Sequence, residues 1–128
     1  MRTLLHLTPA LFLLMAGSCT GQPSSRDLNV EEFGRALLAD HVQLVDVRTP
    51  GEYAAGHLKG AKLMDWNGGQ FQKEMTKLDK DKPVLLYCGS GRRSDAALQE
   101  LEKAGYRDVK HLVGGIQAWT QGGRPVAR

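Results

Sequence analysis

The residues of this chain that are best suited to carry out a chemical reaction lie between Cys88 and Ser94, in the order Cys-Gly-Ser-Gly-Arg-Arg-Ser. Helix N-terminal amides and nearby arginines lower the pKa of a cysteine by roughly one to several units. Successive N–H groups of such a loop, two serine hydroxyls and two guanidinium groups can also surround an anion. The segment therefore predicts a reactive thiolate in an anion-binding loop, suited to sulfur or phosphorus chemistry. The expected binding residues are Gly89, Ser90, Gly91, Arg92 and Ser94.

The residues on either side of this loop indicate how it is held. Residues 83–87 are apolar and β-prone, so they predict a buried strand that ends at Cys88. Residues 94–104 predict a helix with Ser94 as its N-cap. Gly89 and Gly91 allow the positive φ values that a tight turn between these elements requires. The thiol is thus expected at the carboxyl end of a strand, where parallel α/β sheets bind ligands.

The rest of the chain alternates between strand and helix patterns. Strands are predicted over residues 43–47, 61–64, 84–87 and 109–113. Helices are predicted from a capping box at Asn29 and Glu32, and over residues 50–56, 71–78, 94–104 and 115–120. This alternation in 128 residues predicts one α/β domain with a parallel sheet.

The spacing within the loop separates two kinds of chemistry. Tyrosine-phosphatase-like enzymes use a cysteine, five residues and then an arginine, whereas the sixth residue after Cys88 is Ser94. The two arginines occupy the fourth and fifth positions, so the loop is one residue shorter. A tighter cradle suits a single sulfur atom better than phosphate. A phosphatase or arsenate reductase is kept as a less favoured alternative, as is an inert buried cysteine.

Three segments resemble the rhodanese (sulfurtransferase) family: residues 46–61, residues 88–94, and residues 105–106 together with 113–119. The resemblance covers roughly residues 26–126. It implies a rhodanese-like α/β fold, a five-stranded parallel sheet flanked by helices on both faces. It implies no cofactor.

The resemblance also implies a two-step sulfur transfer. The Cys88 thiolate would take sulfane sulfur from a small anionic donor such as thiosulfate, and the resulting persulfide would pass it to cyanide or a thiol. Arg93 matches the arginine that ends the family loop, so it would attract the donor and stabilise charge, with Arg92 assisting. The alternative is a persulfide carrier or binding module that hands sulfur to a partner protein without turnover.

Several other polar and aromatic residues are expected to support the structure. Asp46, Arg48 and Glu52 predict a buried polar network near the site, and His57 a hydrogen-bonded scaffold. The remaining histidines after the signal segment, His41 and His111, are expected at the surface, and no metal site is expected because the histidines lack ligand spacing. Trp66 and Trp119 are expected to pack, and the loop 65–69 to border the pocket.

The first residues predict export. Residues 1–18 have a basic start, an apolar stretch and a small-residue end, as in a signal peptide cleaved before Cys19. Residues 15–19 resemble the lipobox of bacterial lipoproteins, in which the cysteine is acylated, although Ala16 stands where the pattern prefers Leu. An ordinary signal peptidase would cut at the same place. The expected location is the periplasmic side of a bacterial membrane, lipid-anchored through Cys19 or soluble.

The remaining composition limits the partners. Residues 19–25 are small and polar and predict a tether. If Cys19 is acylated, Cys88 has no second cysteine in the mature chain to pair with. The net charge of +3 comes from scattered basic residues, so nucleic-acid binding is not expected. The protein is expected to be a monomer.

Overall fold

The computed structural model describes residue 17 and residues 26–128. Apart from Gly17, the predicted signal peptide (1–18), Cys19 and the tether (19–25) lie outside the described residues. None of the helices in the described part is long and apolar enough to cross a lipid bilayer.

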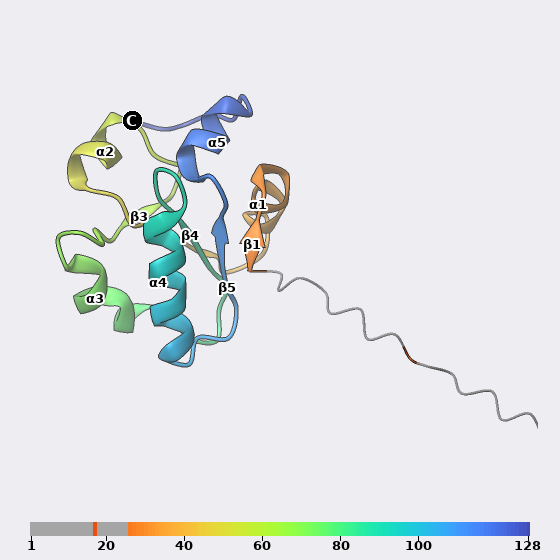
Figure 1. The fold of residues 1–128 in the computed structure, drawn as a ribbon, viewed down its shortest axis with the longest axis vertical. Helices are drawn as coiled ribbons and strands as arrows, with labels where there is room; N and C mark the ends of the chain where they lie inside the picture. Colours follow the sequence, from red (N-terminus) through yellow and green to blue (C-terminus); the bar gives the residue numbers. More distant parts are fainter. Residues whose placement is uncertain (1–16, 18–25) are drawn as a thin grey trace, which may run out of the picture.

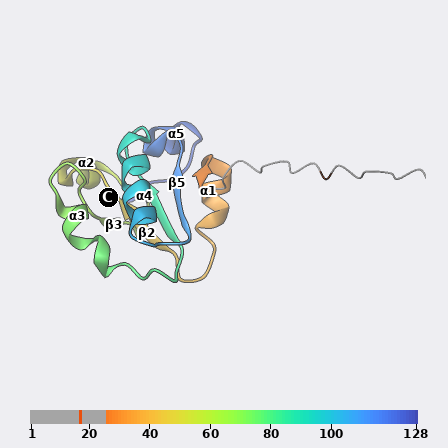
Figure 2. The ribbon, with the colours of Figure 1, turned by 60° about the horizontal axis from the view of Figure 1, so that its bottom comes forward.

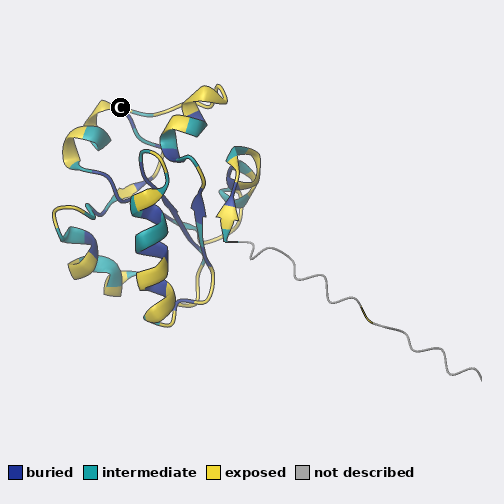
Figure 3. Cartoon of the chain, viewed as in Figure 1, coloured by how far each residue is buried: buried dark blue, intermediate teal, exposed yellow. Residues whose placement is uncertain are grey.

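Five parallel strands form one sheet, as the family resemblance implied, and their order is β1-β5-β4-β2-β3. Their bounds are β1 Asp27–Leu28, β2 Gln43–Asp46, β3 Lys62–Leu63, β4 Val84–Tyr87 and β5 Val109–Leu112. The pattern of the sequence did not predict β1, whose two residues pair with β5. Strand β4 is central, and all four of its residues are buried, which matches its continuous apolar sequence (Figure 3).

Helices cover both faces of the sheet (Figures 1 and 2). Helices α3 (Gln70–Glu74) and α4 (Arg92–Lys103), with a 3₁₀ turn at Met75–Lys77, share a core with one face. Helices α1 (Val30–Ala36), α2 (Pro50–Ala55) and α5 (Gly115–Gln121) pack on the other. Because successive side chains of a strand point to opposite faces, Leu86 enters the first core and Leu85 the second.

The two helices that follow β1 and β2 begin with the same local motif. The predicted capping box of α1 is confirmed: the Asn29 side chain accepts from the Glu32 amide at 2.9 Å, and the Glu32 carboxylate accepts from the Asn29 amide at 2.9 Å. Thr49 and Glu52 form a second capping box at α2. This second box fixes the position of Glu52 at the edge of the site.

Helix α4 begins at Arg92, two residues before the predicted start at Ser94. Its N-cap is Gly91, whose φ of +108° makes the turn without a side-chain cap. The prediction of Ser94 as N-cap is therefore wrong: Ser94 lies in the first turn, and its hydroxyl donates to the Gly91 carbonyl at 3.2 Å. Gly89 does not adopt a positive φ, so Gly91 alone supplies the left-handed turn in the loop.

The order of the strands places the Cys88 loop where the chain leaves two neighbouring strands toward opposite edges of the sheet. Strand β2 leads through α2 to β3 at one edge, whereas β4 leads through α4 to β5 toward the other edge. Chains leaving in opposite directions open a crevice above the carboxyl ends of β2 and β4. Cys88 follows β4 at this crevice, and Arg48 lies just beyond β2.

Candidate active site

The thiol of Cys88 lies at the end of β4, almost wholly buried, beneath the turn that starts α4. The Gly91 amide donates to Sγ at 3.0 Å. Burial raises the pKa of the thiol, but hydrogen bonds from the Ser94 hydroxyl and from the amides of Ser94, Gly91 and Ser90 outweigh it. The pKa of Cys88 therefore lies below its ordinary value, as the sequence predicted for a nucleophile.

The first residues of α5 support the loop through backbone hydrogen bonds. The amide of Ile116 donates to the Cys88 carbonyl at 2.8 Å, and the amide of Gln117 donates to the Gly89 carbonyl at 3.2 Å. A Cβ atom at Gly115 would lie 2.5 Å from the same two carbonyl oxygens, so only glycine allows this approach. With these carbonyls bonded to α5, the later amides of the loop are left to face the sulfur. This supporting role depends on how α5 packs against the loop, which the sequence pattern does not predict.

A cavity of about 410 Å³ opens beside the loop. It is lined by Trp66, Asn67, Ser90, Arg92, Arg93 and Ala96. The predicted loop 65–69 thus contributes two residues to the border of the pocket. Trp66 also packs against Phe71, with ring centroids 5.5 Å apart, so it serves both the core and the rim.

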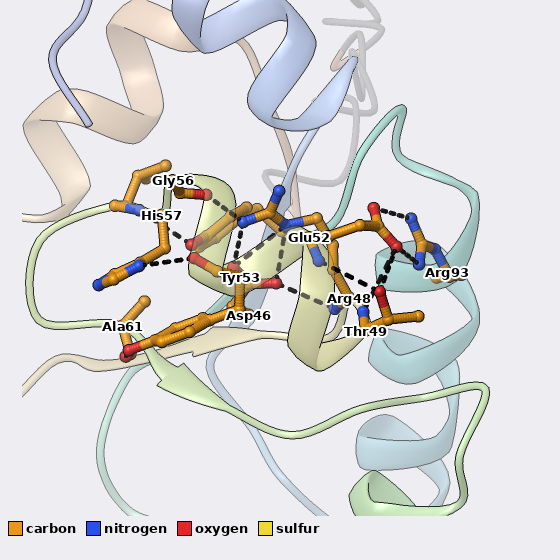
Figure 4. A network of polar contacts seen from close by, with 11 residues as sticks. Asp46, Arg48, Thr49, Glu52, Tyr53, Gly56, His57, Ala61 and Arg93 are labelled. Atoms are coloured by element: carbon orange, nitrogen blue, oxygen red, sulfur yellow. Dashed lines mark hydrogen bonds and ion pairs between the residues drawn. The ribbon is translucent and has the colours of Figure 1, made fainter. Parts of the chain in front are cut away.

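The two loop arginines differ in their partners. Arg93 forms a two-pronged ion pair with Glu52 of α2, with Nη1–Oε1 at 2.8 Å and Nη2–Oε2 at 3.0 Å (Figure 4). The pair raises the pKa of Arg93 and lowers that of Glu52 to about 2. Arg92 is exposed and has no ion-pair partner among residues 26–128. Glu52, predicted to be structural, therefore contacts the loop directly.

The buried polar network predicted near the site is present for Asp46 and Arg48, whereas Glu52, predicted to belong to it, is partly exposed and pairs with Arg93 instead (Figure 4). Arg48 donates from Nη2 to Asp46 Oδ2 at 2.7 Å and to the Gly56 carbonyl at 2.7 Å. Burial lowers the pKa of Arg48, but hydrogen bonding to Asp46 outweighs it and the pKa is raised. Because these bonds close both side chains on each other, Asp46 and Arg48 fix the segment after β2 rather than face the pocket.

His57 also serves as a scaffold. Its ring stacks on Tyr53 with centroids 3.8 Å apart, and its Nδ1 lies 2.9 Å from the Tyr53 carbonyl oxygen. The backbone of His57 exchanges two hydrogen bonds with Ala127, which ties this turn to the last residues of the chain. Both the ring and the backbone of His57 are thus held by neighbouring residues, in agreement with its expected supporting role.

The expectation for His111 is wrong, because this residue is buried rather than exposed. Its Nδ1 lies 2.9 Å from the Ser94 hydroxyl and its Nε2 lies 3.1 Å from Oδ1 of Asp27. Position 111 alternates to the face of β5 that α4 covers, a placement that its spacing along the chain could not show. Asp95 adds a carboxylate 3.9 Å from Nε2. Since both ring nitrogens already have partners, we assign no metal ion to this cluster.

Comparison with known proteins agrees with this geometry. Residues 29–122 match the family model of the rhodanese-like domain. The probable adenylyltransferase/sulfurtransferase MoeZ of Mycobacterium tuberculosis is 40% identical over 82 residues, which are 64% of this chain and 21% of MoeZ, so the chain spans about a fifth of that relative. A sulfurtransferase of Allochromatium vinosum is 39% identical over 101 residues, covering 78% of this chain and 92% of the relative. The crystal structure of a rhodanese-related protein from Thermoplasma volcanium superposes with a TM-score of 0.71 at 26% identity, covering 80% of this chain and 97% of that one.

Proposed function

This chain belongs to the rhodanese-like family, and we propose that it is a sulfurtransferase that carries sulfane sulfur as a persulfide on Cys88. The observation that carries the proposal is the thiol itself, buried at the end of β4 with its pKa lowered by one hydroxyl and three amides. These donors stabilise a negative sulfur, and they suit the outer sulfur of a persulfide in the same way. The names of the relatives support sulfur transfer as the general activity.

The proposed reaction has two displacements. The Cys88 thiolate attacks the outer sulfur of a donor such as thiosulfate; a new S–S bond forms, the old one breaks, and sulfite leaves with the electron pair. A cyanide ion or a thiolate acceptor then attacks the outer sulfur of the persulfide. The second S–S bond breaks and Cys88 departs as the thiolate, so the site returns to its starting state. A low pKa aids the last step because a stable thiolate is a better leaving group.

We assign different tasks to the two arginines. Arg93 is engaged at both outer nitrogens by Glu52, so its charge is largely compensated and it acts mainly to fix the loop. Arg92 lines the cavity without an ion-pair partner in the described part of the chain. We infer that Arg92 gives the anionic donor its main electrostatic anchor, which reverses the order of importance expected from the family motif.

The test is sulfur transfer from thiosulfate to cyanide by the full chain and by its Cys88→Ser variant. We expect turnover by the wild type and none by the variant, because the hydroxyl is not a nucleophile here. Cys19→Ser is the matched control, since it removes the other cysteine of the mature chain, and it should retain turnover. Undiminished activity of Cys88→Ser would overturn the proposal.

Two alternatives predict different results for the same pair of proteins in two further assays. A persulfide on Cys88 with no turnover on cyanide or small thiols would identify a carrier for a partner protein. Hydrolysis of an aryl phosphate that depends on Cys88 would identify a phosphatase. In both alternatives Cys88 remains the nucleophile, and only the substrate or the acceptor differs.

We also propose that the protein acts on the periplasmic side of a bacterial membrane, with a lipid on Cys19. The support is the sequence of residues 1–19 alone. The intact mass of the protein from its native membrane gives the test. A mature chain that begins at an acylated Cys19 is expected, whereas a chain that retains residues 1–18 would contradict the proposal.

A further inference from the structure

The last residues of the chain take no part in the proposed sulfur transfer, yet they are bonded at two places. Residues 124–128, the C-terminal strap, run from the turn after α5 to a position beside α2 (Figure 1). Near α5, the indole N–H of Trp119 donates to the Pro125 carbonyl at 2.9 Å. Beside α2, the Ala127 amide donates to the His57 carbonyl at 2.7 Å, and the His57 amide donates to the Ala127 carbonyl at 3.0 Å. The strap therefore links the two helices.

The bonds to His57 connect the strap to α2 itself, because His57 is held by that helix. Its ring stacks on Tyr53 of α2, and its Nδ1 lies 2.9 Å from the Tyr53 carbonyl oxygen (Figure 4). The Tyr53 hydroxyl in turn donates to the Ala61 carbonyl at 2.8 Å. The strap is thus bonded to the C-terminal end of α2 through a side chain that is fixed on both sides.

Both helices that the strap joins also support the Cys88 loop. From α5, the amides of Ile116 and Gln117 donate to two carbonyls of the loop. From α2, the Glu52 carboxylate accepts two hydrogen bonds from Arg93, at 2.8 and 3.0 Å. A change in the separation of α2 and α5 would therefore act on the loop from two sides.

A cavity of about 230 Å³ lies between these two helices. Its lining includes Ala55 and Gly56 at the end of α2, Gln117 and Thr120 of α5, and Val126 of the strap. Because side chains do not fill this space, packing between the two helices does not set their separation here. The strap crosses the space and connects its two sides.

We propose that the C-terminal strap is a positioning element of the active site, which fixes the separation of α2 and α5 and thereby the loop around the Cys88 sulfur. With the strap bonded, the Gly91 amide stays 3.0 Å from Sγ. Without it, α5 can shift across the cavity, and the loop follows because its carbonyls are bonded to α5. The strap lines neither cavity beside the loop, so it acts only through the helices. The inference rests on the proposed function of Cys88.

The test replaces Ala127 by proline in the full chain, which removes the N–H that donates to His57. Ala127→Ser is the matched control because it keeps this N–H. We expect kcat for sulfur transfer from thiosulfate to cyanide to fall about tenfold in Ala127→Pro, since a misplacement of about 1 Å can cost up to about 10²-fold. KM for thiosulfate should change by less than about twofold. Its proposed anchor, Arg92, belongs to α4, which forms no hydrogen bond with the strap in the described part of the chain.

Amide hydrogen exchange gives a second readout, which depends neither on the reaction nor on a general loss of stability. In Ala127→Pro, the amides of Gly91, Ile116 and Gln117 should exchange faster than in the wild type. The amide of Val84, at the opposite end of β4 from the loop, should exchange at the wild-type rate. Such a pattern would locate the change at α5 and the loop.

A second variant keeps the proposal testable if Ala127→Pro does not fold. Val126→Gly removes the side chain of the strap that lines the cavity, and it should lower kcat and speed exchange of the same three amides. Wild-type kcat or unaltered exchange of these amides in a folded variant would overturn the role of the strap. An equal loss in Ala127→Ser would do so too. Sulfur transfer that survives Cys88→Ser would instead overturn the proposed function and leave the exchange result unaffected.

Discussion

The reactivity of Cys88 is decided by two opposed effects at the scale of single residues. Burial disfavours a charged sulfur, whereas the Ser94 hydroxyl and the loop amides favour it. The hydrogen bonds prevail, so the pKa of the thiol lies below its ordinary value although the sulfur is almost wholly buried. Such a nucleophile is activated without a base in direct contact with it.

Removal of the Ser94 hydroxyl should therefore weaken the nucleophile. We expect Ser94→Ala to raise the pKa of Cys88, since a hydrogen bond to a charged group contributes roughly 1.5–3 kcal/mol. Alkylation of Cys88 by iodoacetamide near neutral pH, followed by the mass of its peptide, would slow by about tenfold. Ser90→Ala is the matched control because Ser90 supplies its backbone amide, which alanine retains. Equal rates for the two variants would contradict the role of the hydroxyl.

The exposed charge of Arg92, which has no ion-pair partner among residues 26–128, should control the binding of the donor. Arg92→Ala is expected to raise the KM for thiosulfate by about tenfold with little change in kcat, since one charged hydrogen bond is lost. Arg92→Lys should recover part of the loss. Lys103→Ala, which removes a positive charge from the far end of the same helix, should leave KM unchanged. A KM for Arg92→Ala within twofold of wild type would return the role to Arg93.

At this scale the chemistry near the cysteine was predictable and the chemistry from across the sheet was not. Cys88, its glycines and its arginines are consecutive in the sequence, so their proximity is guaranteed. His111 reaches Ser94 only because β4 and β5 pair in parallel, with Leu86 opposite His111. The Glu52–Arg93 pair likewise joins residues 41 positions apart. Such contacts depend on the register and packing of elements, which residue types alone do not specify.

At the scale of elements, α5 approaches the loop closely at Gly115. Gly115→Ala would place Cβ 2.5 Å from two carbonyl oxygens, at a φ of +59°. We expect a loss of about 2–5 kcal/mol in unfolding free energy, from overpacking and left-handed strain together. Sulfur transfer should also fall, since the loop amides would be displaced from Sγ.

Gly123→Ala is the control variant, because it introduces backbone strain without a steric clash. Gly123 has a φ of +73° but nothing within 4 Å of a Cβ atom, so its substitution should cost only about 1–2 kcal/mol and leave activity intact. Thermal melting and the sulfur-transfer assay give both readouts. If the two variants lost the same stability and activity, the close contact of α5 would not be what positions the loop.

The ion pair between α2 and α4 should make stability depend on acid. Because the pKa of Glu52 falls from an ordinary 4.5 to about 2, its contribution is complete above pH 4.5 and is lost as the pH falls toward 2. The melting temperature of Glu52→Gln should therefore lie below that of wild type at neutral pH, and the gap should close between these values. Glu31→Gln, from a highly exposed pair with Arg35, should show almost no gap. A difference in melting temperature that does not change with pH would show that the ionised Glu52 carboxylate is not the source of the stabilisation.

Most elements were predictable because each has its own local cause. Three local signals predicted element boundaries closely. The capping box at Asn29 marks the start of α1, the continuous apolar run marks β4, and a glycine marks the end of α2. Strand β1 was missed because two residues carry no periodicity, and its strand character comes from pairing with β5. The start of α4 was misplaced because Gly91 begins the helix with its backbone conformation instead of a side-chain cap.

The whole molecule places one reactive crevice on a sheet with two separate cores. The chain leaves β2 and β4 toward opposite edges of the sheet, and helices from both faces contact the loop: α4 begins in it, while α2 and α5 form hydrogen bonds to it from the other face. The site is therefore sensitive to packing on both sides of the sheet. The fold class followed from the alternation of strands and helices, while its family and strand count followed from the three motifs together.

The central claim is that Cys88 carries sulfur, and the mass of its peptide tests this most directly. The full chain is treated with thiosulfate, digested without reductant and compared with untreated protein. We predict a gain of one sulfur atom on the peptide that contains Cys88, its removal by cyanide, and no gain in Cys88→Ser. An unchanged mass of that peptide, or a gain that persists in Cys88→Ser, would contradict the account.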